Sequence, residues 1–389
     1  MVIEENYYNL QKRLESTNWM FGESVTLEIP PYKYTEGEEI SDDDEMIRRL
    51  IQEYNRVVNL YKKTGSFWDE WTETEKKDIH EALINQDFHA VKNLLRNPSQ
   101  NQLFLGFDWN HKTFNRDAKN KDEAAFGWLH NHSLSYEELL ARLIYDGLML
   151  FAADCGVVRT EYPEKGIDFI RKEKCVDVNS IISGIKNAIG IDFDFPNPFK
   201  DEFGIIINGG VISYRAIQSL FQAYRLNQFI MYYGLGKKVL EIGGGLGRTA
   251  YYASKMYGMD YTIVDIPITN VAQGYYLGLT LGNDLVAFNK EKNYHDKIKI
   301  LSASSLDEIT EQYDVIINCD SITEFDWSTQ NKYWEFIANH SMWFFSINHE
   351  GNSHTVRDLY ADDFSVDKYW RQQYTLRRGY VEEIIKFKG

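Results

Sequence analysis

Cysteine is scarce in this chain of 389 residues, and the few cysteines lie far apart. Cys155, Cys175 and Cys319 are odd in number and form no CxxC pair, so the sequence predicts neither a disulfide framework nor a zinc site. An apolar run of about 18 residues is also missing, as are the basic start and apolar stretch of a signal peptide. We therefore expect a protein without a membrane span, located in the reducing cytoplasm.

Positive charge is in short supply as well. The chain has 42 Lys and Arg against 58 Asp and Glu, a formal net charge of -16, whereas broad binding to nucleic acid needs clustered cations to neutralise phosphates. We therefore expect no nucleic-acid partner. The length exceeds what one small core usually holds, so two domains are expected.

The first half of the chain is predicted to be mainly helical. Ser41 and Asp44 form a capping-box pattern, and apolar residues then recur at helical spacing as far as Gly65. The same periodicity predicts further helices within residues 72–95 and 135–151.

Two segments lack this periodicity, and we interpret them from their amino-acid composition. The polar stretch 106–133 contains His130-Asn131-His132, which we interpret as loop residues, because two histidines at i and i+2 without a third ligand nearby favour no metal site. Residues 190–210 hold two prolines and four glycines, which indicates a connecting segment. We expect a helical N-terminal domain over 1–205, acting as a substrate lid or an oligomer contact, and a second domain over 206–389.

The second half alternates between strands and helices. A helix is expected from about residue 213 to 233, and apolar strand candidates follow it. They are residues 239–242, 261–264, 298–301, 315–317, 343–347 and 384–387. This alternation predicts an α/β fold with a parallel, doubly wound sheet, in which ligands lie at the carboxyl ends of the strands.

The first of these strands runs into a glycine-rich turn, Glu241-Ile-Gly-Gly-Gly-Leu-Gly247. Glycine lets the backbone turn tightly and approach a ligand closely. A nicotinamide dinucleotide would suit the GxGxxA pattern of residues 245–250, with Asp265 as the ribose-binding carboxylate. S-adenosylmethionine has no phosphate, and its sulfonium and ammonium groups are favoured by a carboxylate at Glu241, which would repel a pyrophosphate. We favour S-adenosylmethionine.

Residues 239–247 resemble motif I of the class I S-adenosylmethionine-dependent methyltransferases, whose sheet is a seven-stranded, Rossmann-like variant of the doubly wound fold. The resemblance covers about residues 237–389. It implies a cofactor held by the glycine turn, by the end of the second strand and by the end of the fourth, while Ser304 stands where many members carry an acid. The cofactor residues so implied are Glu241, Gly243, Gly244, Gly245, Gly247, Asp265, Ile266, Ser304 and Asn318.

A narrower likeness is to bacterial sugar O-methyltransferases associated with surface-polysaccharide gene clusters. It rests on the long helical region before the glycine turn, on the stretch 318–324 and on the stretch 346–349. The likeness implies methyl transfer to a hydroxyl of a sugar, nucleotide-activated or destined for a polysaccharide. A methyltransferase acting on another small metabolite, an NAD-dependent oxidoreductase and an inactive binding module stay open as alternatives.

Methyl transfer to a hydroxyl needs a group that removes the proton while the oxygen attacks in line. His349 is our first choice as general base, because histidine exchanges protons near neutral pH. Asp320 and Glu324 would orient the base or the sugar, and with His349 they could hold a divalent metal, which we do not predict.

Polar residues near the same strand ends are candidates for the substrate site. They are Tyr214, Arg215, Asn348, His354 and Arg357. We expect a sugar or nucleotide-sugar as the small-molecule partner and leave open whether the chain forms a homo-oligomer.

Overall fold

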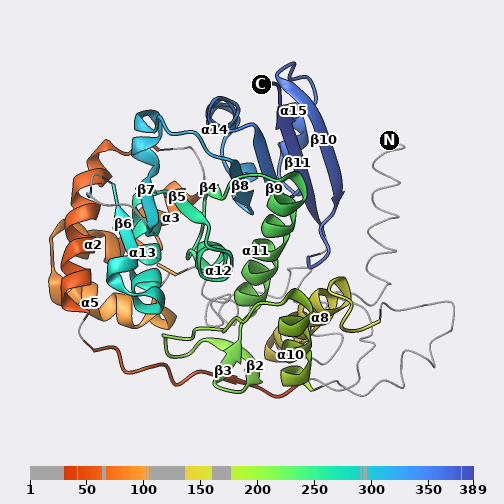
Figure 1. The fold of residues 1–389 in the computed structure, drawn as a ribbon. Helices are drawn as coiled ribbons and strands as arrows, with labels where there is room; N and C mark the ends of the chain where they lie inside the picture. The colour runs from red at the N-terminus through yellow and green to blue at the C-terminus, as the bar shows by residue number, and fades with distance from the viewer. Residues whose placement is uncertain are drawn as a thin grey trace, which may run out of the picture. The chain divides into compact units, whose positions relative to one another are not determined.

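The computed structural model describes residues 30–41, 43–63, 67–101, 103–104, 136–159, 177–289, 291, 296–377 and 379–389 (Figure 1). The chain divides into two compact units, which are described separately. Unit 1 takes the described parts of Met1–Thr35, Asp108–Phe195 and Glu202–Gln218, and unit 2 those of Glu36–Phe107, Pro196–Asp201 and Ser219–Gly389. The segment Glu36–Phe107, near the N-terminus, thus belongs to the same unit as the C-terminal half. This division differs from the single boundary at residue 205 that we expected. A lid or oligomer role for the N-terminal region stays a prediction.

Unit 1 contains a small antiparallel sheet in the order β1-β2-β3 and two helices. The strands are β1 (Tyr32–Tyr34), β2 (Phe203–Ile207) and β3 (Gly210–Ile212), and the helices are α8 (Tyr136–Asp154) and α10 (Val178–Ile189). Helix α8 packs against α10 and β2.

The hairpin of β2 and β3 corrects one prediction, because β2 and the hairpin loop lie within residues 190–210, where we expected a connecting segment, and β3 begins at its last residue. The two-residue loop Asn208-Gly209 joins them, with Gly209 at φ 92°. An Asn-Gly pair between apolar residues is a strong hairpin signal, and the prolines and glycines around it obscured that signal.

Unit 2 is built on a sheet with the strand order β10-β11-β9-β8-β4-β5-β7-β6. Its strands are β4 (Lys238–Ile242), β5 (Asp260–Asp265), β6 (Val286–Phe288), β7 (Ile298–Ser302), β8 (Val315–Cys319), β9 (Trp343–His349), β10 (Val366–Gln373) and β11 (Tyr380–Phe387). Strand β11 runs antiparallel to β9 and β10, and the remaining pairs are parallel. The predicted Rossmann-like α/β fold is confirmed, and within the described residues the sheet has eight strands instead of seven.

The prediction missed β6 and β10 for different reasons. Strand β6 has three residues, too few for a periodic signal. Strand β10 is polar and mostly exposed, because it forms the edge of the sheet. Neither strand shows the alternation of apolar residues that marks a half-buried strand.

Helices cover both faces of this sheet (Figure 1). Those of the N-terminal part are α2 (Asp44–Val57), α3 (Phe67–Glu73), α4 (Lys77–Ile84) and α5 (Phe88–Arg96); those of the α/β part are α11 (Tyr214–Tyr233), α12 (Arg248–Tyr257), α13 (Pro267–Leu281), α14 (Trp327–His340) and α15 (Val356–Tyr360). One apolar cluster joins the inward side of α14 and α15 to a face of β4, β8, β9 and β11. On the opposite face, Phe229 of α11 packs against Phe345 of β9.

The first helix of the described residues, α2, begins at Asp44, later than predicted, and its N-cap residue Asp43 makes no side-chain cap hydrogen bond. The buried carboxylate of Asp43 instead accepts hydrogen bonds from Arg96 of α5 at 2.5 Å and from the Tyr275 hydroxyl of α13 at 2.6 Å. These bonds, together with the direct packing of α2 on α13, fasten the N-terminal helices to the helix that follows β5.

Candidate functional site

The glycine turn at the end of β4 has a conformation that only glycine adopts without strain. Gly243 has φ +73°, and a Cβ there would lie 2.1 Å from the Ser321 hydroxyl oxygen. Gly247, at φ +85°, would place a Cβ 2.9 Å from Leu277. A Cβ on Gly245, at φ +54°, would instead meet nothing within 4 Å. The turn is therefore packed on its inner side and open on the side of Gly245.

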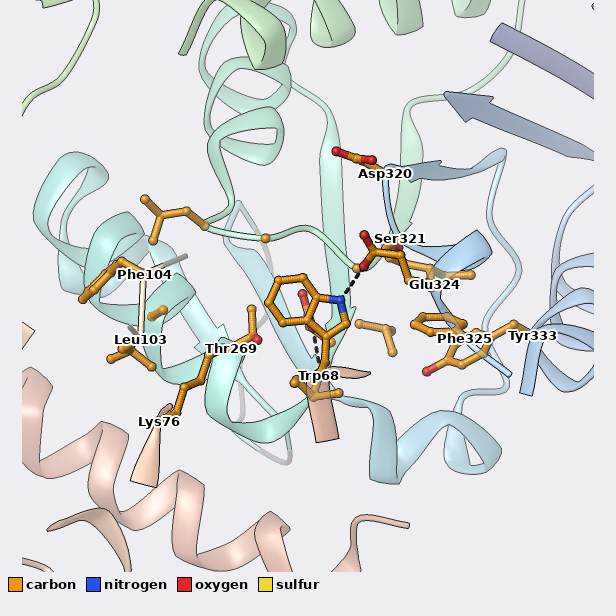
Figure 2. A pocket seen from close by; sticks show the side chains of 18 residues that line it. Trp68, Lys76, Leu103, Phe104, Thr269, Asp320, Ser321, Glu324, Phe325 and Tyr333 are labelled. Carbon is orange, nitrogen blue, oxygen red and sulfur yellow. Dashed lines mark hydrogen bonds between the residues drawn. The ribbon is translucent and has the colours of Figure 1, made fainter. Parts of the chain in front are cut away.

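A pocket of about 120 Å³ lies at this turn, at the carboxyl ends of β4, β5 and β8 (Figure 2). The order of strands along the sheet reverses between β4 and β8, which is where doubly wound folds bind ligands. Its lining residues are Trp68, Lys76, Leu103, Phe104, Ile242, Gly243, Gly245, Leu246, Val264, Asp265, Ile266, Thr269, Ala272, Asp320, Ser321, Glu324, Phe325 and Tyr333. Pockets for drug-sized ligands start at roughly 300 Å³, so a nucleoside-sized ligand requires lining side chains to move outward.

As predicted, Asp265 lies at the end of β5. Asp265 and the following Ile266 both line the pocket, and the role of Asp265 in cofactor binding stays a prediction. Its carboxylate accepts hydrogen bonds from the Ile266 amide and from the side-chain amide of Gln273, both at 2.8 Å. Gln273 also donates to the Gly245 carbonyl at 2.9 Å and so links Asp265 to the turn. Burial raises the pKa of Asp265 to about 6, although the Ile266 hydrogen bond and the charge of Lys76 oppose this rise.

The N-terminal helices supply two polar residues of the pocket, Trp68 and Lys76, which the sequence did not predict. Trp68 belongs to α3, and its indole nitrogen donates a hydrogen bond to Glu324 (Figure 2). Lys76 precedes α4; its ammonium lies 5.3 Å from the centre of the Trp68 ring. Burial lowers the pKa of Lys76 to about 8. No motif marks either residue, because both precede the glycine turn by more than 150 positions.

Glu241 does not line the pocket but lies behind the turn. Its side chain is 2% exposed and accepts a hydrogen bond from the Tyr261 hydroxyl at 3.1 Å. A Cβ on Gly244 would come within 3.0 Å of its carboxylate. Burial raises the pKa of Glu241 to about 8, so the carboxyl group carries a proton at neutral pH in the folded, ligand-free protein. A direct contact between Glu241 and a cofactor stays a prediction.

Asn318 and Asn348 form part of a buried network that fixes the loop after β8. The Asn318 amide donates to the Ile242 carbonyl at 2.7 Å and to the Ser321 hydroxyl at 2.6 Å. The Asn348 amide donates to the Asn318 side-chain oxygen at 2.8 Å, while its own oxygen accepts from the Ser321 backbone at 3.1 Å. Neither asparagine lines the pocket. Here both position the loop, and their predicted ligand contacts are not tested.

Asp320 lies at the rim of the pocket in a left-handed conformation, with φ 59°. Such a backbone is uncommon for a residue other than glycine, and aspartate is among the residues that tolerate it. The Asp320 carboxylate accepts hydrogen bonds from the Arg377 guanidinium at 2.7 Å and from the Tyr380 hydroxyl at 2.6 Å. These two donors stabilise its ionised form.

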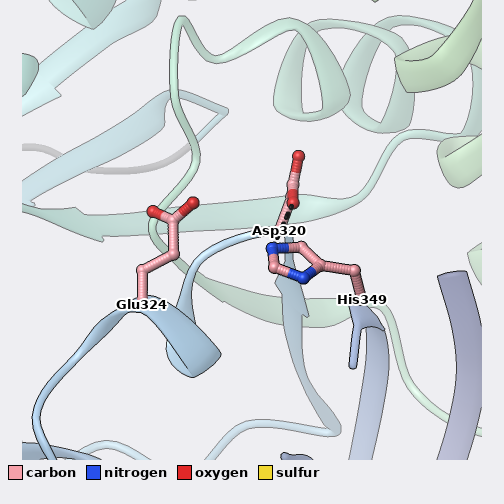
Figure 3. A group of neighbouring side chains, drawn as sticks. All are labelled: Asp320, Glu324 and His349. Atoms are coloured by element: carbon pink, nitrogen blue, oxygen red, sulfur yellow. Dashed lines mark ion pairs between the residues drawn. The ribbon is translucent and has the colours of Figure 1, made fainter. Parts of the chain in front are cut away.

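The structure brings together the three predicted catalytic residues, Asp320, Glu324 and His349 (Figure 3). One ligand atom of each lies within 4.8 Å of those of the others, and His349 Nε2 is 4.0 Å from Asp320 Oδ1. His349 Nδ1 accepts a hydrogen bond from the Gly351 amide at 3.1 Å. Since a backbone amide can only donate, the proton of a neutral His349 lies on Nε2, the nitrogen that faces Asp320. This tautomer makes His349 a donor within the cluster.

The same three side chains have the composition of a metal site. At Asp320, however, the Arg377 guanidinium already supplies the positive charge that a divalent ion would bring, at 2.7 Å from a carboxylate oxygen. A cation bound here would have to displace Arg377 or lie beside it. The arrangement therefore suits proton handling and hydrogen bonding to hydroxyl groups better than metal binding.

The other predicted residues lie away from the pocket lining. Ser304 bonds the Ser302 hydroxyl at 2.8 Å, and His354 packs on Trp327 with the ring centres 4.5 Å apart. Arg357 is exposed on α15. Gly244 and Gly247 belong to the turn but do not line the pocket. Tyr214 and Arg215 belong to unit 1, and His130 and His132 lie outside the described residues.

The pocket has an acidic character. Among its described lining residues, Asp265, Asp320 and Glu324 are acidic and Lys76 is the one cation, and Arg377, outside the lining, balances the charge of Asp320. Apolar and aromatic side chains make up the rest of the wall. This combination suits a ligand with an apolar ring, hydroxyl groups and positive charge, and it disfavours a pyrophosphate next to Asp320 and Glu324.

No helix in the described part of the chain is both long and apolar enough to span a membrane.

No protein-family model and no curated protein sequence matches the chain. Among solved structures, the chain is similar to magnesium protoporphyrin IX methyltransferase from Synechocystis with bound SAM, at 12% identity and a TM-score of 0.33 over 44% of this chain and 83% of that one. It is also similar to an O-methyltransferase from Bacillus cereus in complex with SAH, at 16% identity and a TM-score of 0.33 over 43% and 81%. Likeness at this level establishes neither a family nor an activity for the chain.

Proposed function

We propose that the chain is an S-adenosylmethionine-dependent O-methyltransferase that methylates a hydroxyl group of a sugar. The observation that carries the proposal is the pocket at the open side of the glycine turn, which is lined by the carboxylates of Asp265 and Glu324 and by one lysine, while Asp320 at its rim is paired with Arg377. S-adenosylmethionine is cationic at its reacting end and has no phosphate, so this charge distribution favours it over a dinucleotide.

The residues present match such a cofactor in their chemistry, and outward movement of lining side chains would give it the space that the pocket of about 120 Å³ lacks. The open side at Gly245 leaves room for a ligand to approach the backbone. Asp265 would hold the ribose hydroxyls, because each of its oxygens has a second lone pair beyond the bond from Ile266 or Gln273. The apolar wall, which includes Leu246 and Phe104, would cover the adenine. When bound, S-adenosylmethionine supplies an electrophilic methyl group.

The chain's own residues would handle the proton of the acceptor hydroxyl. His349 was our first choice as base, but its only lone pair, on Nδ1, already accepts from Gly351. Asp320 is held as a carboxylate by Arg377 and Tyr380, which weakens it as a proton acceptor. Glu324 accepts a hydrogen bond from the indole of Trp68, which is a neutral donor, unlike the guanidinium at Asp320. We therefore assign Glu324 as the general base and His349 and Asp320 to orientation of the acceptor.

A sugar acceptor is supported by the hydrogen-bonding groups at the rim and by the sequence resemblance. The carboxylates of Asp320 and Glu324 accept hydrogen bonds from hydroxyl groups, which a sugar presents in pairs. The stretches 318–324 and 346–349, which carry the resemblance to sugar O-methyltransferases, supply the whole cluster.

The test is a product analysis. The purified chain is incubated with S-adenosylmethionine and a panel of nucleotide-activated sugars, and products are analysed by mass spectrometry. The proposal predicts a gain of one methyl group on the sugar, lost in Glu324→Gln. Methylation of nitrogen, or of acceptors without a sugar, would refute the sugar assignment, and reduction or oxidation with a nicotinamide cofactor would refute methyl transfer itself.

A further inference from the structure

The Lys76 ammonium is an unusual feature of the pocket. The residue is 3% exposed and lines the pocket beside Asp265. No hydrogen bond or ion pair joins its ammonium to another residue in the described part of the chain; its described contact is the face of the Trp68 ring. Burying an ammonium without an acceptor is costly, and a ligand that supplied an acceptor atom would offset that cost.

The position of Lys76 is fixed by its backbone and by the helices around it. The Lys76 amide donates to the Trp71 carbonyl at 3.0 Å, and the Lys76 carbonyl accepts from the His80 amide at 3.0 Å. Helix α4, which begins after Lys76, packs on α2, and α2 packs on α13, the helix that follows Asp265. The lysine is thus held opposite the end of β5 by ordered elements.

Lys76 and Asp265 face the same pocket and influence each other by charge without a hydrogen bond between them. A carboxylate accepts hydrogen bonds and an ammonium donates them. A pair of neighbouring hydroxyl groups can satisfy both at once, since each hydroxyl donates through its proton and accepts through its oxygen. The ligand chemistry that fits between these two side chains is a vicinal diol.

We propose that Lys76 is a second ribose-binding residue, which donates to a ribose hydroxyl oxygen of the cofactor while Asp265 accepts the hydroxyl protons. This inference rests on the proposed function. It gives the helices before the glycine turn a part in cofactor specificity, because Lys76 would favour a ribose over a deoxyribose.

The experiment is calorimetric titration of the full chain with S-adenosylhomocysteine and with its 2′-deoxy and 3′-deoxy analogues. The variant is Lys76→Met, and the matched control is Lys77→Met, which removes an exposed lysine one position later. Charged hydrogen bonds are worth roughly 10- to 100-fold in affinity. We expect Lys76→Met to lower the affinity for S-adenosylhomocysteine by about that factor. This variant should bind one of the deoxy analogues about as tightly as it binds S-adenosylhomocysteine itself, while Lys77→Met should bind all three ligands as the wild type does.

A structural role would give a different pattern. If Lys76→Met binds S-adenosylhomocysteine as tightly as Lys77→Met does, or loses the same factor for all three ligands, the ribose assignment is wrong. If the wild-type chain binds none of them, the proposed function fails first and the inference fails with it.

Stability gives a second readout. Replacing a buried charge with an apolar side chain should leave the Tm of the ligand-free protein unchanged or raise it, while the rise in Tm caused by S-adenosylhomocysteine becomes smaller. If Lys76→Met does not fold, Lys76→Leu, which also lacks a hydrogen-bond donor, takes its place with the same expected loss of discrimination against a deoxy analogue.

Discussion

The protonated state of Glu241 leads to a prediction about stability. Its carboxyl group is buried behind the glycine turn, and burial raises its pKa from 4.5 to about 8. The native state therefore holds this proton over a pH interval in which the unfolded chain has released it. By linkage, Glu241 contributes stability that is fully present below about pH 4.5 and is lost as the pH rises to about 8.

The magnitude follows from that interval. Each pH unit between the two pKa values costs up to about 1.4 kcal/mol of unfolding free energy, so the whole interval costs at most about 5 kcal/mol. Entry of water and local relaxation reduce such penalties, and we expect about 2 to 5 kcal/mol. Glu241→Gln removes the titration and keeps an oxygen that can accept from Tyr261, which now donates at 3.1 Å.

The assay is urea unfolding, followed by circular dichroism, of wild type and Glu241→Gln from about pH 5 to about pH 9. The two proteins should be similar at the acidic end, and the variant should be the more stable one at the alkaline end. Glu311→Gln is the control, because hydrogen bonding to Lys238 lowers the pKa of Glu311. At the alkaline end the wild type should therefore have a higher free energy of unfolding than Glu311→Gln. A difference between wild type and Glu241→Gln that does not change with pH would refute the assignment of a buried, protonated Glu241.

Three further predictions concern the chemistry and the turn. With an acceptor from the sugar panel, Glu324→Gln should lower kcat by about 100-fold or more and His349→Asn by about 10-fold; a larger loss for His349→Asn would reverse the assignment of the base. Gly243→Ala should lower Tm and abolish S-adenosylhomocysteine binding, because its Cβ would lie 2.1 Å from the Ser321 oxygen. Gly258 has φ +62° and open space around it, so Gly258→Ala should lower Tm but keep S-adenosylhomocysteine binding. Treatment with a chelator should leave the rate of methyl transfer unchanged, because Arg377 already neutralises Asp320; loss of activity that added metal restores would contradict this.

Local sequence patterns predicted the α/β part of unit 2 well. Apolar runs located β4, β5, β7, β8, β9 and β11, and the parallel sheet then placed Asp265, Asp320 and His349 at one edge. These residues follow directly from their strands, so the fold fixes their neighbourhood. The same reasoning named Asn318 and Asn348 as ligand contacts, but it did not reveal that their side chains bond each other across adjacent strands.

The contributions of distant segments could not be predicted. Trp68 and Lys76 belong to a group of helices that docks on α13 through α2, where the Tyr275 hydroxyl donates to the buried Asp43, a residue 232 positions earlier in the chain. Periodicity marks these helices as amphipathic but does not say what they pack against. The tautomer of His349 depends in the same way on one backbone amide, that of Gly351.

The central claim, a site for S-adenosylmethionine at the glycine turn, is tested most directly by calorimetric titration of the chain with S-adenosylhomocysteine and, separately, with NAD. We predict micromolar binding of S-adenosylhomocysteine, weakened by roughly 10- to 100-fold in Asp265→Asn and unchanged in Asp260→Asn, which alters an exposed carboxylate at the opposite end of β5. Binding of NAD with no binding of S-adenosylhomocysteine would contradict the account.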